Sequence, residues 1–208
     1  MMSMRVFFDT NVLMHAVRRE HVACPVLVEW GGRVNTLQVH EIAEKPPRTD
    51  WLQEEIDCLP AVAAFVKDET IRPCISTETI MDGMGRGVSR LYESELSIFE
   101  GIEFERAGEP EELGMTRIAF GAGFNPGEVR KKFLSTNVYA RFNELKAAAG
   151  GNKDADAFLI WTAESAGIEY FLTTDRKLVN SVRGQRSCVI GTHVLYPSEL
   201  LKLLDAKR

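Results

Sequence analysis

The chain has 208 residues, of which 45% are hydrophobic, and a formal net charge of −5. This length and composition fit one packed domain rather than a disordered chain. The acidic balance argues against a protein that coats nucleic acid through bulk charge, so any such contact must come from basic clusters such as 86–90 and 130–132. No stretch reaches the ~18 apolar residues of a membrane span, and no secretory signal is apparent, so we expect a cytoplasmic protein without a membrane partner.

The first half of the chain begins with a strand and a helix. Residues 5–9 are a short apolar run without alternation, which indicates a strand buried on both faces. A hairpin is predicted within 26–39, where two β-rich runs flank a pair of glycines. The other elements predicted here are a helix over 10–18, a helix over 51–67 divided near Pro60, a strand over 71–76, and helices over 77–84 and 88–99.

The second half contains a segment without a clear pattern, followed by regular alternation. We treat 106–136 as an insertion or lid, although Asn125 is well placed to cap a helix within it. The other elements predicted here are a strand over 102–105, helices over 138–149 and 155–166, a strand over 169–173, a helix after Asp175, a strand near 188–190 and a helix over 197–204. Strands that alternate with helices imply a parallel sheet.

Acidic residues stand where such a sheet binds ligands. Asp9 and Asp175 close two of the predicted strands, and ligands of open parallel sheets lie outside the carboxyl ends of the strands. Asp156 falls in the first turn of a helix, on the same rim. Asp82 follows the second parallel strand, with Glu78 one turn earlier on the same helix face. We therefore expect Asp9, Asp82, Asp156 and Asp175 to reach one cavity.

A group of carboxylates calls for a cation. Like charges raise one another's pKa, and a divalent ion keeps the carboxylates ionised. Hard oxygen ligands without an accompanying His or Cys set favour Mg²⁺ or Mn²⁺ over zinc. Such a metal can activate water and stabilise the displacement at a phosphodiester.

Several of these residues also have an ordinary structural interpretation. An Asp at a strand end is often a turn former or a helix cap. Asp154 is expected to be such an N-cap, which leaves Asp156 as the functional acid. Glu78 fits a first-turn acid that complements the helix dipole. For Asp82 two interpretations stay open, a metal ligand and a structural acid.

Two polar residues flank the strand ends. Asn11 can turn its amide towards Asp9 or a metal-bound water, or it can cap the helix that starts there. Thr173 can orient the site through its hydroxyl, or it can serve as an ordinary β-branched strand residue.

Cysteine and histidine give no metal-binding pattern. The cysteines, none of which forms a C-x-x-C pair, are Cys24, Cys58, Cys74 and Cys188. The histidines, which lack ligand spacing and receive no role, are His15, His21, His40 and His193.

Around these acids the sequence resembles the PIN domain family. The strand and Asp-Thr-Asn motif appear as FFDTNVL around Asp9, the third acid as DAFLIWTA from Asp156, and the fourth as LTTD ending at Asp175. The closing VLYPSELLKLL is also similar. The second acid of the family is usually Glu, whereas ISTETIMDG places Asp82 there and leaves Glu78 as a substitute.

The resemblance implies a fold and a function. The expected fold is α/β, a three-layer sandwich with a central, mainly parallel sheet, formed by one domain over 1–208 with insertions at about 20–50 and 106–136. The expected activity is cleavage of single-stranded RNA by a Mg²⁺- or Mn²⁺-dependent endoribonuclease. Metal-bound water is the expected nucleophile, so no side chain needs to attack. The resemblance also suggests a homodimer and a protein inhibitor or antitoxin. The site it implies consists of metal ligands Asp9, Asp82, Asp156 and Asp175, with Glu78 as substitute, supported by Asn11 and Thr173.

Two rival functions come from other classes. A haloacid-dehalogenase-like phosphatase also begins with an apolar strand and a catalytic Asp, but it needs a second Asp two residues later, where this chain has Asn11. A catalytically impaired PIN-like module that binds RNA or a protein partner is favoured by Asp82 in place of Glu. The sequence leaves open the choice between RNA and DNA and between a toxin and a processing enzyme.

Overall fold

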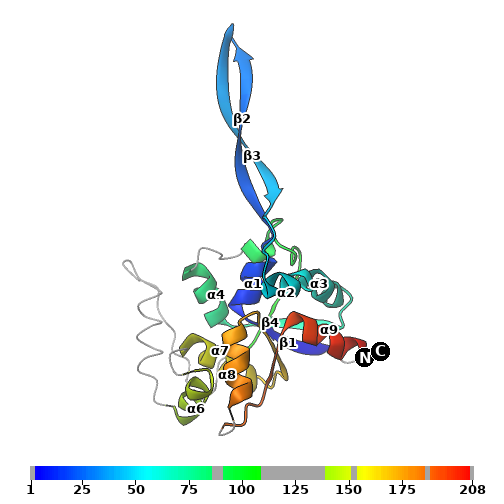
Figure 1. The fold of residues 1–208 in the computed structure, drawn as a ribbon, viewed down its shortest axis with the longest axis vertical. Coiled ribbons are helices and arrows are strands. Elements are labelled where there is room, and N and C mark those ends of the chain that lie inside the picture. Colours follow the sequence, from blue (N-terminus) through cyan, green and yellow to red (C-terminus); the bar gives the residue numbers. More distant parts are fainter. Residues whose placement is uncertain (1–2, 86–90, 109–138, 151–153, 186–187, 207–208) are drawn as a thin grey trace.

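The computed structural model describes residues 3–85, 91–108, 139–150, 154–185 and 188–206. These form an α/β fold with a five-stranded parallel sheet in the order β5-β4-β1-β6-β7. The strands are β1 (Met4–Phe8), β4 (Ile71–Ile75), β5 (Glu105–Arg106), β6 (Tyr170–Leu172) and β7 (His193–Leu195). Helices flank the sheet (Figure 1). The predicted α/β class with a parallel central sheet is confirmed.

The central strand β1 divides the core into two layers because its side chains alternate between the faces of the sheet. Phe7 points to one face, where its ring stacks on Phe171 with centroids 5.3 Å apart. Val6 and Phe8 point to the other face. Helices over the Phe7 face are α6 (Ala140–Ala148), α7 (Asp154–Ser165) and α8 (Arg176–Gly184). Helices over the opposite face are α1 (Thr10–Ala16), α3 (Leu59–Lys67) and α9 (Pro197–Asp205).

Local sequence explains where several helices begin and end. All residues over 157–163 of α7 are buried, as expected for a helix that is apolar all round, and the chain leaves this helix through Gly167 at φ 64°. The helical pattern over 51–67 divides, as predicted, into α2 (Trp51–Asp57) and α3. The junction is Cys58, and Pro60 lies in the first turn of α3, where a missing N–H costs no hydrogen bond.

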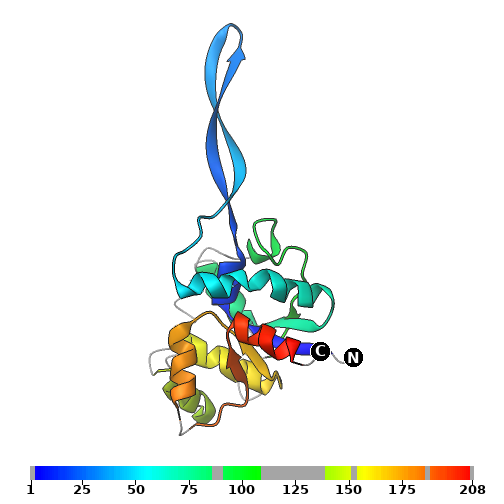
Figure 2. The same ribbon diagram turned by 45° about the vertical axis from the view of Figure 1, so that its right-hand side comes forward.

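The predicted hairpin is present and is longer than expected. It consists of β2 (Arg19–Trp30) and β3 (Arg33–Glu44), which pair antiparallel along their whole length. Gly31 and Gly32 have φ of 63° and 70°, and a two-residue turn with positive φ at both positions suits the twist of a hairpin. The hairpin forms its own two-stranded sheet and projects away from the rest of the fold (Figures 1 and 2). We call residues 19–44 the arm.

The prediction of a helix over 88–99 is wrong for residues 91–99, the part of this range that the structure describes. Residues 91–93 form a short 3-10 helix, η1 (Leu91–Glu93), and turns follow. The backbone of this segment is used by the base of the arm instead: Leu96 O accepts from the N–H groups of Arg18 and Arg19. The strand predicted over 102–105 is reduced to the two residues of β5.

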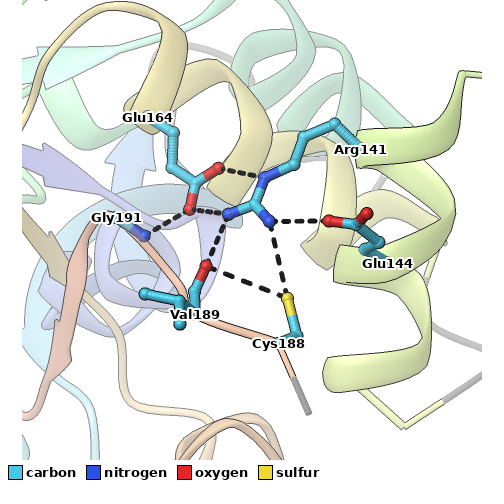
Figure 3. Close-up of polar contacts among 6 residues, drawn as sticks. All are labelled: Arg141, Glu144, Glu164, Cys188, Val189 and Gly191. Atoms are coloured by element: carbon cyan, nitrogen blue, oxygen red, sulfur yellow. Dashed lines mark hydrogen bonds and ion pairs between the residues drawn. The ribbon is translucent and has the colours of Figure 1, made fainter.

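The strand predicted near 188–190 is also wrong, and the fifth strand is β7. Residues 188–191 are held by Arg141 of α6 (Figure 3). Its guanidinium donates to both carboxylate oxygens of Glu164 at 2.9 and 2.7 Å, and to Val189 O at 2.8 Å. Glu164 also accepts from Gly191 N–H. Because two backbone groups of this loop, Val189 O and Gly191 N–H, bond to these side chains rather than to a strand, the loop lies outside the sheet, and Val189 is 87% exposed.

Some expectations lie outside the described residues. These are the helix start at Asn125, most of the 106–136 insertion and the basic clusters at 86–90 and 130–132. In the parts of the chain that are described, no helix is both long and apolar enough to cross a membrane.

Candidate functional site

Asp9 lies at the carboxyl end of the central strand, between β1 and α1. Its backbone N–H donates to Leu172 O at 3.0 Å, and its carbonyl accepts from Val12 N–H at 3.0 Å. It occupies the N-cap position of α1, but its carboxylate makes no capping hydrogen bond. The ordinary interpretation of Asp9 as a side-chain cap therefore fails, and its carboxylate, in a residue only 1% exposed, is directed elsewhere.

The Asp9 carboxylate is held through one of its two oxygens. Thr173 Oγ1 donates to Asp9 Oδ2 at 2.7 Å, and Asn11 Nδ2 donates to the same oxygen at 3.0 Å. Thr173 Oγ1 in turn accepts from Asp175 N–H at 3.0 Å. In the described parts of the chain no donor reaches Oδ1, so this oxygen keeps its capacity to bind a ligand. Both supporting residues predicted from the sequence, Asn11 and Thr173, thus contact Asp9.

Burial dominates the electrostatics of Asp9. The pKa of the Asp9 carboxyl is raised from 3.8 to about 6, and burial is the largest cause. The hydrogen bonds from Thr173 and Asn11 lower this pKa, whereas the negative charges of Asp156 and Asp82 add to the rise. At neutral pH this carboxylate is mainly ionised although it is buried. A cation placed beside it would offset both the desolvation and the repulsion.

Two of the predicted acids come near Asp9 from different helices. Asp82 lies on α4 (Thr77–Gly85), which packs against both α1 and α7, and it is 7% exposed. Asp156 lies in the first turn of α7. Because the charges of both influence Asp9, the structure brings Asp9, Asp82 and Asp156 into one electrostatic neighbourhood.

Asp154, predicted as the N-cap of this helix, instead lies within it as its first residue. Its Oδ1 forms an ion pair with Lys146 Nζ of α6 at 2.6 Å. The side chain of Asp154, which was predicted to cap α7, therefore forms an ion pair with α6. Asp154 is therefore an acid close to Asp156 in the chain whose carboxylate has a structural partner, which makes it a suitable control residue.

Asp175 is the N-cap of α8. Its Oδ1 accepts from Lys177 N–H at 2.7 Å and from Leu178 N–H at 3.0 Å, which satisfies two of the free donors of the first helical turn. Through its own N–H it is tied to Thr173, and so to Asp9. Its role as a metal ligand stays a prediction, because the observed contacts account for it as a cap.

Glu78 lies in the first turn of α4 and is 8% exposed. The start of that helix is capped by a different pair, Ser76 and Thr79. Thr79 N–H donates to Ser76 Oγ at 3.1 Å, and Ser76 N–H donates to Thr79 Oγ1 at 3.3 Å. The S-x-x-T pattern in the sequence was the signal for this pair, and the capping contacts seen at this helix start are those of Ser76 and Thr79.

The donor chemistry suits a hard cation, but the acids do not form a complete cage. Within the described ranges, no group of three or more His, Cys, Asp or Glu side chains is arranged to hold a metal ion. Asp9, Asp82 and Asp156 supply only carboxylate oxygens, which are the ligands that Mg²⁺ and Mn²⁺ prefer. Of the four acids predicted to converge, three are seen to be close electrostatically, because the charges of Asp82 and Asp156 raise the pKa of Asp9.

Trp51, Tyr196 and Arg176 form an aromatic cluster that was not predicted from the sequence, and Arg176 directly follows Asp175 in the chain. The guanidinium of Arg176 stands over the Trp51 ring, 5.5 Å from its centroid, and the Trp51 and Tyr196 rings are 5.6 Å apart. Arg176 is exposed, and both rings are half-buried. The only sequence signal was a tryptophan at the start of a helix, because the three residues are far apart in the chain.

In comparisons with known proteins, no family model, no curated protein and no solved structure matches this chain.

Proposed function

We propose that this protein is a PIN-type endoribonuclease that uses a carboxylate-bound Mg²⁺ or Mn²⁺ to cut single-stranded RNA at the carboxyl end of its parallel sheet. The observation that carries this proposal is Asp9, a buried acid at the end of the central strand. Its carboxylate does not cap the helix, is oriented by Thr173 and Asn11, and has two further acids in electrostatic range.

The residues have distinct roles in this proposal. Asp9, Asp82 and Asp156 would hold the metal, with Asp175 and Glu78 as the remaining predicted ligands. When bound, the metal would supply an activated water and stabilise charge on the phosphodiester. Thr173 and Asn11 are positioning residues: by donating to Oδ2 they fix the carboxylate plane and leave Oδ1 for the ligand.

In this proposal the aromatic cluster contacts the substrate. Bases of single-stranded RNA stack on aromatic rings and on guanidinium planes, and such stacking tolerates any base. Trp51, Tyr196 and Arg176 provide these groups, and Arg176 directly follows Asp175 in the chain. This local contact is compatible with the net charge of −5, which disfavours binding through bulk electrostatics.

The experiment that tests the proposal is a cleavage assay with end-labelled, mixed-sequence single-stranded RNA in Mg²⁺, Mn²⁺ or EDTA. We expect metal-dependent cleavage that Asp9→Asn abolishes. Asp154→Asn is the matched control, because it removes an acid close to Asp156 in the chain that pairs with Lys146. Single-stranded DNA and duplex RNA substrates define the substrate class. Equal cleavage by Asp9→Asn and the parent, or equal cleavage in EDTA, would contradict the proposal.

A second candidate is a PIN-like module that binds RNA or a protein partner without cutting. Two observations favour it: Asp82 in place of the usual Glu, and the lack of a three-ligand metal group among the described side chains. Retention of labelled RNA in a mobility-shift assay, with no cleavage at any metal concentration, would select this function.

A further inference from the structure

The arm carries most of the large hydrophobic side chains that are exposed in the described parts of the chain. Of the large hydrophobic side chains that are exposed in the described ranges, all except Val189 lie on it. They are Val22, Val26, Leu27, Trp30, Val34, Leu37, Val39 and Ile42. Exposed patches of this kind usually mark an interaction site. A two-stranded ribbon is also marginal by itself in water, so a covering partner would stabilise it.

The two faces of the arm differ in composition. Directly paired residues of a hairpin share a face, so the register defines each face row by row. On one face, the two central rows are apolar on both strands, namely Cys24 with Val39 and Val26 with Leu37. On the other face, each row that contains a large apolar residue pairs it with a polar one, as Leu27 with Thr36. We call the first of these the apolar face.

The ends of the apolar face carry opposite charges. Near the base, Glu20 pairs with Ala43, and Glu41 pairs with Val22. Towards the tip, Arg33 pairs with Trp30. The face is therefore acidic at its base, apolar in its middle and basic at its tip.

We propose that the apolar face is a dimerisation surface that binds the same face of a second copy of this chain, with the two arms antiparallel. A two-fold axis between the two central rows brings the Glu20 row of each copy opposite the Trp30 row of the other. Glu20 then lies within reach of the second copy's Arg33, and the central apolar rows cover each other. The arrangement is isologous, as expected for a two-fold dimer.

The other orientation and another class of partner fit less well. Parallel arms would place Glu20 on Glu20 and Arg33 on Arg33, and like charges across an interface are unfavourable. Nucleic acid is disfavoured because residues 19–44 contain four glutamates but two arginines and no lysine. Both views show the arm twisted along its length, so two arms would coil around each other (Figures 1 and 2). This inference is independent of the proposed nuclease activity.

The first test measures the mass of the full chain by sedimentation equilibrium. A ribbon of 12-residue strands gives a contact at the small end of specific interfaces, so concentrations should extend to about 100 µM. We expect a monomer of 23.3 kDa to form a dimer over this range. Val26→Asp should weaken dimerisation at least tenfold. Leu27→Asp is the matched control, since Leu27 is more exposed, at 71%, but lies on the opposite face, and it should leave dimerisation nearly unchanged.

The second test fixes the orientation by exchanging charges. Within one chain, Glu20 and Arg33 stand at opposite ends of the arm, so they can compensate each other only between copies. Glu20→Arg and Arg33→Glu should each weaken dimerisation, and the chain carrying both changes should regain it. Near-parental melting temperatures of all variants would show that the domain is folded.

Three outcomes would overturn the proposal. The first is a monomer at every concentration. The second is an equal effect of Val26→Asp and Leu27→Asp, which would indicate unspecific association. The third is a doubly exchanged chain that dimerises no better than the single variants. A monomer whose RNA binding is lost on Val26→Asp would assign the arm to nucleic acid instead.

Discussion

Thr173 Oγ1 lies 2.7 Å from Asp9 Oδ2, and this hydrogen bond joins the carboxyl ends of two adjacent strands across 164 positions of sequence. The same hydroxyl accepts from Asp175 N–H, so one side chain links the first and the fourth of the predicted acids. Because hydrogen bonds to an ionised carboxylate favour its charged form, Thr173 makes the buried Asp9 a better anionic ligand than burial alone would allow.

Asp9→Asn should stabilise the metal-free protein at neutral pH. The pKa of Asp9 is raised from its ordinary value of 3.8 to about 6 in the fold, so the folded state binds more protons and loses stability as pH rises between about 4 and 6. That difference corresponds to about 3 kcal/mol at pH 7. Urea unfolding in EDTA should therefore show the variant gaining stability over the parent at pH 7 but not at pH 4. The same difference at both pH values would show that Asp9 is not a buried charge.

Thr173→Val should raise the pKa of Asp9 further and destabilise the fold by about 1–3 kcal/mol, because the hydroxyl makes two hydrogen bonds. Thr173→Ser keeps the hydroxyl and is the control. Unfolding free energies measured from pH 4 to 8 report both effects, since the pH-dependent loss of stability should extend to higher pH in the Val variant. Identical pH profiles for the Val and Ser variants would remove Thr173 from its positioning role.

Asp82 and Glu78 compete for the second acidic position of the proposed site. The negative charge of Asp82 raises the pKa of Asp9, which favours Asp82 as the second acid. We therefore expect Asp82→Ala to lose most of the cleavage activity and Glu78→Ala to lose little. Since a lost ligand weakens metal binding, added Mn²⁺ should partly restore the Asp82 variant. Cleavage rates across a metal titration measure this. The reverse order would assign the position to Glu78, and full activity of both variants at low metal would reduce the site to three acids.

Asp175 has a capping role that can be separated from a metal-binding role. Asp175→Asn keeps an oxygen for the Lys177 and Leu178 N–H groups and should cost little stability, whereas Asp175→Ala should cost about 1 kcal/mol. If Asp175 is also a ligand, the Asn variant should keep its melting temperature and lose metal-dependent cleavage. An Asn variant that retains both would leave Asp175 with the cap alone.

Trp51→Ala should weaken RNA binding if the aromatic cluster stacks bases. Loss of one stacking ring typically costs about 1–3 kcal/mol of binding, so affinity for a single-stranded oligonucleotide should fall roughly tenfold or more. Fluorescence anisotropy with the inactive Asp9→Asn chain as background measures binding without cleavage. Trp51→Phe is the control that keeps a ring. Equal affinities for the Ala and Phe variants would show that the ring does not contact RNA.

Local patterns in the sequence determined much of the fold and pointed to Asp9, the central residue of the proposed site. The apolar run before Asp9, the paired glycines of the arm and the capping position of Asp175 all depend on neighbours within a few residues. For this reason the parallel α/β architecture and most element positions agree with the sequence-based expectations.

The tertiary structure decided what distant residues do to one another. Residues near 188–190 have strand-forming composition, but Arg141 and Glu164 satisfy the backbone of this loop, so the fifth strand forms at His193–Leu195. The raised pKa of Asp9 and its bond to Thr173 likewise arise only when β1 and β6 lie side by side and exclude water. Burial and long-range hydrogen bonding depend on packing between segments, and no local pattern encodes them.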